Sequence, residues 1–165
     1  MIVNIMVRTY GQNCPVAKSL DIFGDRWTLL VVRELLIGKT KYQEIMDALG
    51  GISPNLLSSR LKTLEAAKLV KRKTYEEHPR RMEYRLTKEG ESLKFLLGVF
   101  IHWGGRHFGH EMSLVHEKCG GDLEIRYHCP ACDGAVDNEE VNILRKTHGK
   151  APRRWVFKEY APKKK

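Results

Sequence analysis

The sequence predicts a mainly α-helical fold of the α+β class, with one small β hairpin in its middle. Apolar residues recur at helical spacing in four successive segments, two alternating apolar–polar segments follow, and a longer apolar helical segment comes next. The chain has 165 residues, of which 42% are hydrophobic. That is enough for one ordinary domain, so we expect a helical domain followed by a small C-terminal appendage.

The positive charge of the chain is concentrated in two places. The formal net charge is +9. Residues 39–88 contain twelve Lys and Arg side chains against six acidic ones, and residues 150–165 contain seven against one. A basic surplus placed in this way favours a polyanionic partner.

Several classes of protein find no support in the sequence. No apolar run approaches the roughly 18 residues of a membrane-spanning helix, and the N-terminus has no basic start and no cleavage site of small residues after an apolar stretch. No Gly-rich phosphate loop, nucleophile elbow or metalloprotease helix motif occurs, so we do not expect an enzyme. We expect a cytoplasmic protein with no membrane partner, in a compartment where structural disulfides are rare.

Three helices are predicted in the first 51 residues. The first spans residues 15–23, where Pro15 suits the first helical position and Gly24 ends the helix. The second spans residues 25–37 and includes Trp27, which we interpret as a core anchor. The third lies in "KYQEIMDALGG", where apolar residues have helical spacing and a double glycine follows.

The fourth predicted helix, residues 53–66, has two different faces. Ser53 is a suitable N-cap, and Pro54 suits the first helical position. One face is an apolar stripe, and the opposite face is small, polar and basic. A face without bulky side chains can approach a partner closely and form hydrogen bonds with it. The apolar stripe consists of Leu57, Leu61 and Leu64, and the polar face of Asn55, Ser58, Ser59 and Lys62.

Residues 70–86 are predicted to form a β hairpin with a basic tip, and a long helix is predicted from the cap residue Thr87 to Gly104–Gly105. The expected buried side of this helix consists of Leu93, Leu96, Leu97, Phe100, Ile101 and Trp103. Helices, a hairpin and a further helix in this order are typical of a winged helix-turn-helix. In that fold, the helix at 53–66 enters the major groove of DNA, and the hairpin, called the wing, reaches the flanking backbone or minor groove.

Several blocks of the chain closely resemble the HxlR-type branch of the MarR-like transcriptional regulators. They are "CP-x-A" at 14–17, "GDRWTLL" at 24–30, "GISPNLLSSRLKTLE" at 51–65 and "EYRLTKEG" at 83–90, and the resemblance covers roughly residues 14–108. It implies a homodimeric regulator that binds palindromic promoter sites in a sequence-specific way. It also implies dimerisation through the terminal helices; the small-molecule effector is unknown.

Double-stranded DNA would then contact the outer face of the fourth helix and the tip of the wing. Asn can pair with adenine, and Ser, Lys and Arg can contact base edges or phosphates. The alternatives are a solvated helix face, an edge hairpin whose Lys and Arg side chains prevent aggregation, and a winged helix that binds protein instead of DNA. The predicted DNA-binding residues are Ser53, Asn55, Ser58, Ser59, Arg60, Lys62, Arg80 and Arg81.

Cys14, at the start of the first helix, is a candidate sensor of oxidants or electrophiles. The resemblance implies this role, because several relatives sense through a cysteine at this place, and thiols at helix N-termini are often reactive. No second cysteine occurs before residue 119, so a switch would need Cys14 of the other subunit, a tail cysteine or a small-molecule adduct. The alternative is a small buried residue.

The other three cysteines lie in "HEKCGGDLEIRYHCPACDG", residues 116–134. The turns H-x2-C-G-G and C-x2-C-x-G flank an alternating segment, residues 122–127, which is predicted to be a strand. If that strand brings the turns together, they offer one structural zinc ion a tetrahedral set of ligands, with His128 as a competing ligand. The alternatives are a ribbon held by its apolar residues and a redox-active CxxC. The candidate ligands are His116, Cys119, Cys129 and Cys132.

The predicted organisation has four parts. An N-terminal arm covers residues 1–13, the winged-helix domain for DNA binding and dimerisation covers 14–112, a zinc-ribbon-like hairpin covers 113–138, and a short helix with a basic tail covers 139–165. The basic tail either adds nonspecific affinity for DNA or only keeps the terminus soluble.

Overall fold

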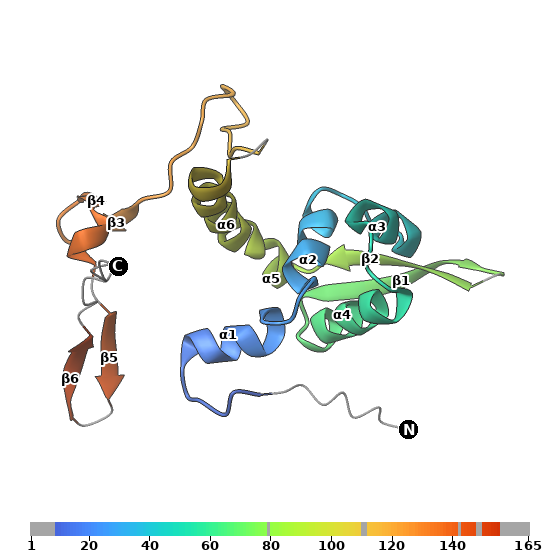
Figure 1. Ribbon diagram of the computed structural model, residues 1–165, viewed down its shortest axis with the longest axis horizontal. Coiled ribbons are helices and arrows are strands. Elements are labelled where there is room, and N and C mark those ends of the chain that lie inside the picture. The colour runs from blue at the N-terminus through green and yellow to red at the C-terminus, as the bar shows by residue number, and fades with distance from the viewer. Residues whose placement is uncertain (1–8, 79, 110–111, 142, 148–149, 156–165) are drawn as a thin grey trace, which may run out of the picture. The chain divides into compact units, whose positions relative to one another are not determined.

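The computed structural model describes residues 9–78, 80–109, 112–141, 143–147 and 150–155 (Figure 1). Most of the predicted N-terminal arm and the basic end of the chain, residues 156–165, lie outside the described residues. The chain divides into two compact units, Met1–Ser113 and Leu114–Lys165, and each is described by itself.

The first unit is a winged helix-turn-helix of the α+β class, as the sequence predicts. Helices come first, an antiparallel hairpin follows, and two further helices complete the unit (Figure 1). In chain order its elements are α1 (Pro15–Phe23), α2 (Thr28–Leu36), α3 (Tyr42–Leu49), α4 (Pro54–Ala66), β1 (Val70–Glu77), β2 (Arg80–Leu86), α5 (Lys88–Glu91) and α6 (Leu93–Phe108).

The core of this unit forms where α2 meets α3, α4 and α6. The predicted apolar stripe of α4 is buried in it, because Leu57, Leu61 and Leu64 are at most 2% exposed. They belong to one cluster with Val31 and Val32 of α2, which are fully buried. Burial of a leucine side chain stabilises a fold by roughly 1.5–3 kcal/mol, so this stripe holds α4 firmly against α2.

The helix α2 begins three residues later than the sequence predicts. Trp27, the residue before it, has φ 82°, in the left-handed region that bulky side chains rarely adopt. The helix can therefore begin only at Thr28. The Trp27 side chain is partly buried and packs against the core, which agrees with its predicted role, and the Arg26 guanidinium lies 5.2 Å from its ring centroid.

The strands β1 and β2 form the predicted wing. They pair antiparallel, with Val70 opposite Leu86 at the base and a bulge in β1 that begins at Thr74. At the base, the Tyr84 amide donates a hydrogen bond to the Thr40 carbonyl at 2.7 Å. This bond joins β2 to the turn before α3, so the base of the wing is attached to the helical part of the unit.

The predicted long helix is in fact two helices. Thr87 is the N-cap of α5, as predicted, and its side chain accepts a hydrogen bond from the Gly90 amide at 3.1 Å. The hydroxyl of Ser92 then donates to the Glu89 carbonyl at 2.6 Å, a bond that competes with continued helix hydrogen bonding. Gly90 also packs so closely that a Cβ atom there would lie 2.1 Å from the Leu69 carbonyl oxygen.

The helix α6 continues past Gly104–Gly105, where the sequence predicts its end. It ends before Gly109, which has φ 67°. Each glycine inside a helix costs about 1 kcal/mol relative to alanine, and aromatic packing along the last turns offsets part of this cost. The Trp103 and Phe108 rings, for example, have centroids 5.6 Å apart. Phe100 and Trp103, which we expected to be buried, are about half exposed in the single chain.

The second unit contains two short hairpins. The strand β3 (Tyr127–Cys129) pairs antiparallel with β4 (Gly134–Val136), and β5 (Ile143–Thr147) pairs antiparallel with β6 (Lys150–Trp155). A single turn of 3-10 helix, η1 (Asn138–Glu140), lies between the hairpins.

Two predictions for this unit are wrong. Residues 123–126 form no strand, so the alternating segment at 122–127 contributes only Tyr127 to a strand. Asp122 makes an isolated bridge with Val115, and the Leu123 amide donates to the Leu114 carbonyl at 2.7 Å. The predicted helix after residue 139 is a β hairpin that follows the single turn η1. Alternation and helical spacing are weak signals in a segment with little apolar surface to bury, and backbone pairing decides its structure instead.

Within the described residues, no helix is long and apolar enough to cross a membrane.

Candidate nucleic-acid interface

The helix α4 presents a polar face whose orientation is fixed by the core beneath it. The side chain of Ser53 caps the helix and accepts a hydrogen bond from the Leu56 amide at 3.3 Å. Asn55 and Lys62 are exposed, and Ser58 and Ser59 are partly exposed. The predicted outer face is therefore assembled as the sequence suggests, and its contact with DNA stays a prediction.

Tyr42 of α3 braces the first turns of α4. Its hydroxyl donates to the Pro54 carbonyl at 2.7 Å and lies 3.2 Å from the Ser58 hydroxyl. A carbonyl in the first turn of a helix also accepts a hydrogen bond within its own helix. The bond from Tyr42 is additional to that one, and it joins α3 to α4. The sequence analysis placed Tyr42 only on an apolar helical face, because nothing in the spacing shows where a phenol hydroxyl will end.

Arg60 makes an intramolecular ion pair. Its guanidinium bonds the carboxylate of Asp25, in the turn before α2. The Arg60 side chain is only 14% exposed, and its Nε atom is buried without a hydrogen-bond partner among the described residues. A contact of Arg60 with phosphate stays a prediction, and in this conformation it requires the pair with Asp25 to open.

Several Arg side chains of the wing are also paired with acidic side chains. Arg72 bonds Glu65 of α4 at 3.0 Å, and Arg81 bonds Glu76 across the hairpin at 3.3 Å. Both arginines remain about half exposed, so solvent weakens these pairs. Arg80 belongs to β2, opposite Glu77, but its side chain lies outside the described part of the structure.

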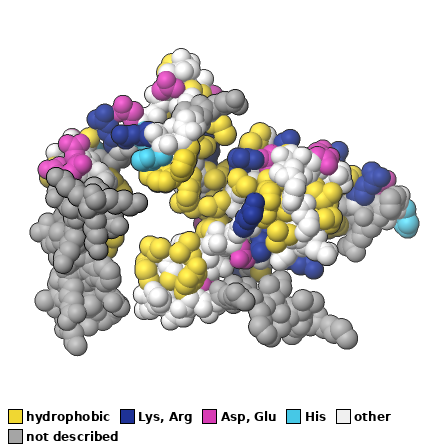
Figure 2. Space-filling model, in the orientation of Figure 1, with side chains coloured by type: hydrophobic (Ala, Val, Ile, Leu, Met, Phe, Trp, Pro, Cys, Tyr) yellow, Lys and Arg dark blue, Asp and Glu magenta, His cyan; other side chains and the backbone are white. Residues whose placement is uncertain are grey.

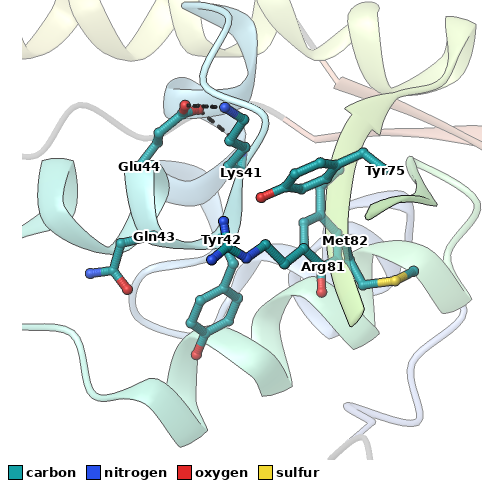
Figure 3. A pocket seen from close by; sticks show the side chains of 8 residues that line it. Lys41, Tyr42, Gln43, Glu44, Tyr75, Arg81 and Met82 are labelled. Carbon is teal, nitrogen blue, oxygen red and sulfur yellow. Dashed lines mark hydrogen bonds and ion pairs between the residues drawn. The ribbon is translucent and has the colours of Figure 1, made fainter. Parts of the chain in front are cut away.

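A groove of about 660 Å³ separates the start of α3 from the wing (Figure 3). The ammonium of Lys41 lies 5.6 Å from the Tyr75 ring centroid and 3.6 Å from a carboxylate oxygen of Glu44. The hydrogen bond from the Lys41 amide to Glu44, at 3.1 Å, holds the pKa of that carboxyl below its usual value. On the wing side, burial raises the pKa of Tyr84. The Lys41 and Glu44 charges at the start of α3 are thus paired with each other within the chain.

Cys14 is the N-cap residue of α1, and its side chain is partly buried. Its carbonyl accepts a hydrogen bond from the Lys18 amide at 3.0 Å, which begins the helix. Val16 and Leu20, which follow on α1, are exposed. The candidate sensor thus lies at the start of a helix that carries an exposed apolar surface.

The four candidate zinc ligands form two pairs. His116 Nδ1 lies 3.2 Å from Cys119 Sγ. The sulfur of Cys129 interacts with Cys132, whose backbone amide and thiol both bond it. The amide of Cys132, with that of Ala131, holds the pKa of Cys129 below its usual value. Among the described residues, no three side chains of the metal-binding types gather closely enough to hold a metal ion, so the pairs do not meet in one cluster.

Comparison with known families decides the class of protein. The chain matches the model of the HxlR-like helix-turn-helix family over residues 22–112. It belongs to this family. The match covers α2 to α6, and therefore both the polar face of α4 and the wing.

Relatives in sequence and structure agree with this assignment. The chain is 36% identical over 130 residues to the HTH-type transcriptional regulator Rv3095 of Mycobacterium tuberculosis, which covers 76% of this chain and 82% of the relative. The crystal structure of PA1607, assigned as a transcription factor, has a TM-score of 0.71 and 28% identity, over 82% of this chain and 97% of that one. The structure of the redox regulator HypR in its oxidized form has a TM-score of 0.53 and 28% identity, over 60% of this chain and 100% of that one. The chain is thus a DNA-binding transcriptional regulator of the winged-helix class and not an enzyme.

The brace between Tyr42 and α4 predicts a measurable loss. The substitution Tyr42→Phe removes the bonds to the Pro54 carbonyl and the Ser58 hydroxyl, so the free energy of unfolding should fall by about 0.5–1.5 kcal/mol. Urea denaturation at fixed protein concentration measures the change. The matched control is Tyr75→Phe, because the Tyr75 hydroxyl makes no hydrogen bond within the described chain and its ring stays over Lys41. Equal losses in the two variants would contradict the brace.

Proposed function

We propose that this regulator binds a palindromic promoter site as a homodimer, with one α4 helix in the major groove of each half-site and the wing on the flanking backbone. The polar outer face of α4 carries the proposal: Asn55 and Lys62 are exposed on a helix whose other side is fixed in the core. Recognition helices of such dimers lie about one helical turn of DNA apart, roughly 34–36 Å.

Support for the dimer comes from exposed apolar side chains on α6. Phe95, Val99 and Trp103 recur at i, i+4 and i+8, so they form one stripe along the helix. Phe95 is 71% exposed in the single chain. Figure 2 shows hydrophobic side chains gathered over α6 and also over α1. A contiguous exposed apolar surface on a helix is typical of a protein interface, and a second copy of the chain supplies an identical surface to cover it.

The lysines of α4 and β1 support binding to the DNA backbone. Lys62, Lys71 and Lys73 are exposed, and no carboxylate of the described chain forms an ion pair with them. An exposed ammonium without an acidic partner can neutralise phosphate directly, and each phosphate neutralised adds about 0.9 to the magnitude of the salt slope.

We further propose that Cys14 makes the regulator responsive to an oxidant or electrophile. Cys14 lies at the start of α1, whose exposed apolar side chains Val16 and Leu20 we propose as a second part of the dimer interface. A chemical change at this thiol would therefore act where a shift in dimer geometry alters the separation of the two α4 helices. The structural similarity to the redox regulator HypR supports this proposal.

Substitutions on α4 separate sequence recognition from backbone binding. Selection of bound DNA from a random pool first gives the operator. Asn55→Ala should then weaken operator binding by about 1–3 kcal/mol and relax the selected sequence, because it removes a bidentate base contact. Lys62→Ala should weaken binding to operator and random DNA alike and lower the magnitude of the salt slope by about 0.9.

Lys94→Ala, an exposed lysine of α6 outside α4 and the wing, is the charge-matched control and should bind as the wild type does. Quantitative gel shifts at several salt concentrations measure all three variants. If no selected fragment binds better than random DNA at moderate salt, sequence-specific regulation by this chain is excluded.

The apolar stripe predicts which substitutions dissociate the dimer. Val99→Glu with Trp103→Glu places two carboxylates in the proposed interface, so the protein should become monomeric at micromolar concentration and bind the operator at least tenfold more weakly. Analytical ultracentrifugation and gel shifts measure both effects. Ile37→Glu, at an exposed apolar side chain after α2, is the control and should remain dimeric. A monomeric wild type, or a dimeric stripe variant, would contradict the proposal.

The proposed sensor predicts a response that depends on one thiol. Treatment with the thiol oxidant diamide should change operator affinity of the wild type several-fold, and the change should be absent in Cys14→Ser. A variant with serine at Cys119, Cys129 and Cys132 keeps Cys14 as its sole cysteine and should still respond. A response that survives Cys14→Ser, or that disappears in the tail variant, would assign sensing to other thiols.

A further inference from the structure

Two turns of the second unit share one backbone layout. The bridge between Val115 and Asp122 flanks the turn at 116–121, and the pair His128 and Ala135 flanks the turn at 129–134. In each turn the first candidate ligand directly follows the paired residue, and the second ligand comes three positions later. His116 and Cys119 thus occupy in the first turn the positions that Cys129 and Cys132 occupy in the second.

The layout extends to the conformation after the second ligand. The next residue is in the left-handed region in both turns, with φ 70° at Gly120 and 49° at Asp133. Each turn is then closed across its ends by a glycine. The His116 amide donates to the Gly121 carbonyl at 2.8 Å, and Cys129 pairs with Gly134 in the β3–β4 register. Two segments of different sequence therefore form the same kind of turn.

Within each turn the donor atoms already lie close together. Ligand bonds of about 2.0–2.3 Å in a tetrahedral zinc site place neighbouring donor atoms roughly 3.5 Å apart. The His116 Nδ1 to Cys119 Sγ distance is 3.2 Å. The Cys129 sulfur accepts hydrogen bonds from the Ala131 and Cys132 amides and interacts with the Cys132 thiol, so these two sulfurs also lie close together.

The residues of the second unit whose burial is described form no apolar core. Among residues 114–141 and 143, whose burial is described, none is buried. Leu123 and Tyr127, which would pack an apolar ribbon, are 46% and 57% exposed. Small units without a core are usually stabilised by a metal or by disulfides, and no disulfide links the tail cysteines here.

We propose that residues 116–134 bind one Zn²⁺ ion per chain through His116, Cys119, Cys129 and Cys132. Each turn is one half of the site, and the metal draws the halves together through residues 124–126, which belong to no strand. Three thiolates and one imidazole complete a tetrahedral set with no open position, so the zinc is structural. Metal sites without a preformed cluster of ligands commonly assemble as the metal binds.

His128 is excluded from the site by its position in the strand. Successive residues of a strand point to opposite faces, so His128 and Cys129 of β3 face apart. The His128 Nε2 atom lies instead 3.7 Å from a carboxylate oxygen of Asp133. This residue therefore serves as the matched control for His116.

Metal analysis of the full chain tests the proposal. Protein purified under reducing conditions should contain one equivalent of zinc, and Co²⁺ in its place should give the visible absorption of a tetrahedral thiolate site. Cys119, Cys129 and Cys132 should resist alkylation until a chelator removes the metal. Less than half an equivalent of zinc with these thiols open to alkylation overturns the proposal, as does a Cys129–Cys132 disulfide in the isolated protein. Half an equivalent per chain overturns a site made within one chain.

Substitutions assign the ligands. His116→Ala, Cys119→Ser and Cys132→Ser should each lower zinc affinity at least tenfold, whereas His128→Ala and Cys14→Ser should retain one equivalent. Retention of zinc by Cys119→Ser and Cys132→Ser, or its loss in His128→Ala alone, overturns the ligand set. Zinc content is measured without DNA, so its outcome is independent of operator binding. Far-UV circular dichroism of each variant reports whether the helical first unit remains folded.

Discussion

The burial of one leucine stripe fixes which face of α4 points outward. Leu57, Leu61 and Leu64 lie against α2 with almost no exposure, so α4 cannot rotate about its axis without opening the core. Because successive residues of a helix are about 100° apart, burial of this stripe forces Asn55 and Lys62 outward. The polar face of α4 is therefore a consequence of core packing. The Tyr42 and Arg60 contacts act on a helix whose rotation is already set.

The cations near that face divide into two groups that differ in their readiness to meet phosphate. Lys62 and Lys71 form no ion pair with a carboxylate among the described residues, and Lys73 only lies opposite Glu83, whereas Arg60, Arg72 and Arg81 form close ion pairs. An exposed pair such as Arg81 with Glu76 is worth at most about 1 kcal/mol, so a phosphate can replace the carboxylate at little cost. Arg60 is mostly buried, and opening its pair with Asp25 would leave a charge with few partners. Its contribution to α4 is therefore positional as long as this pair holds.

Local signals in the sequence predict the first unit well, because caps, glycines and apolar spacing act over a few residues. Ser53, Thr87 and the stripe of α4 all occupy their predicted places. The contacts that the sequence did not reveal join distant segments: Tyr42 meets Pro54, and Arg60 meets a carboxylate 35 residues away. The predicted end of α6 was wrong for a related reason, because aromatic packing stabilises the helix beyond Gly104 and Gly105. Phe100 and Trp103 of this helix are about half exposed, because apolar periodicity marks one face of a helix without showing what covers that face.

The structure of the second unit depends on local backbone pairing more than on burial in a core. The predictions for this unit were less successful for that reason. An alternating segment forms a strand when one of its faces can be buried against a core. In this unit, none of the residues whose burial is described is buried. Residues 124–126 of this segment therefore belong to no strand, whereas Asp122, Leu123 and Tyr127 pair with residues on the far side of the flanking turns. Unpaired backbone between two preformed turns leaves the turns free to approach each other. The failure of the strand prediction thus supports the proposed metal site, because a rigid strand would fix the separation of the half-sites before a metal could set it.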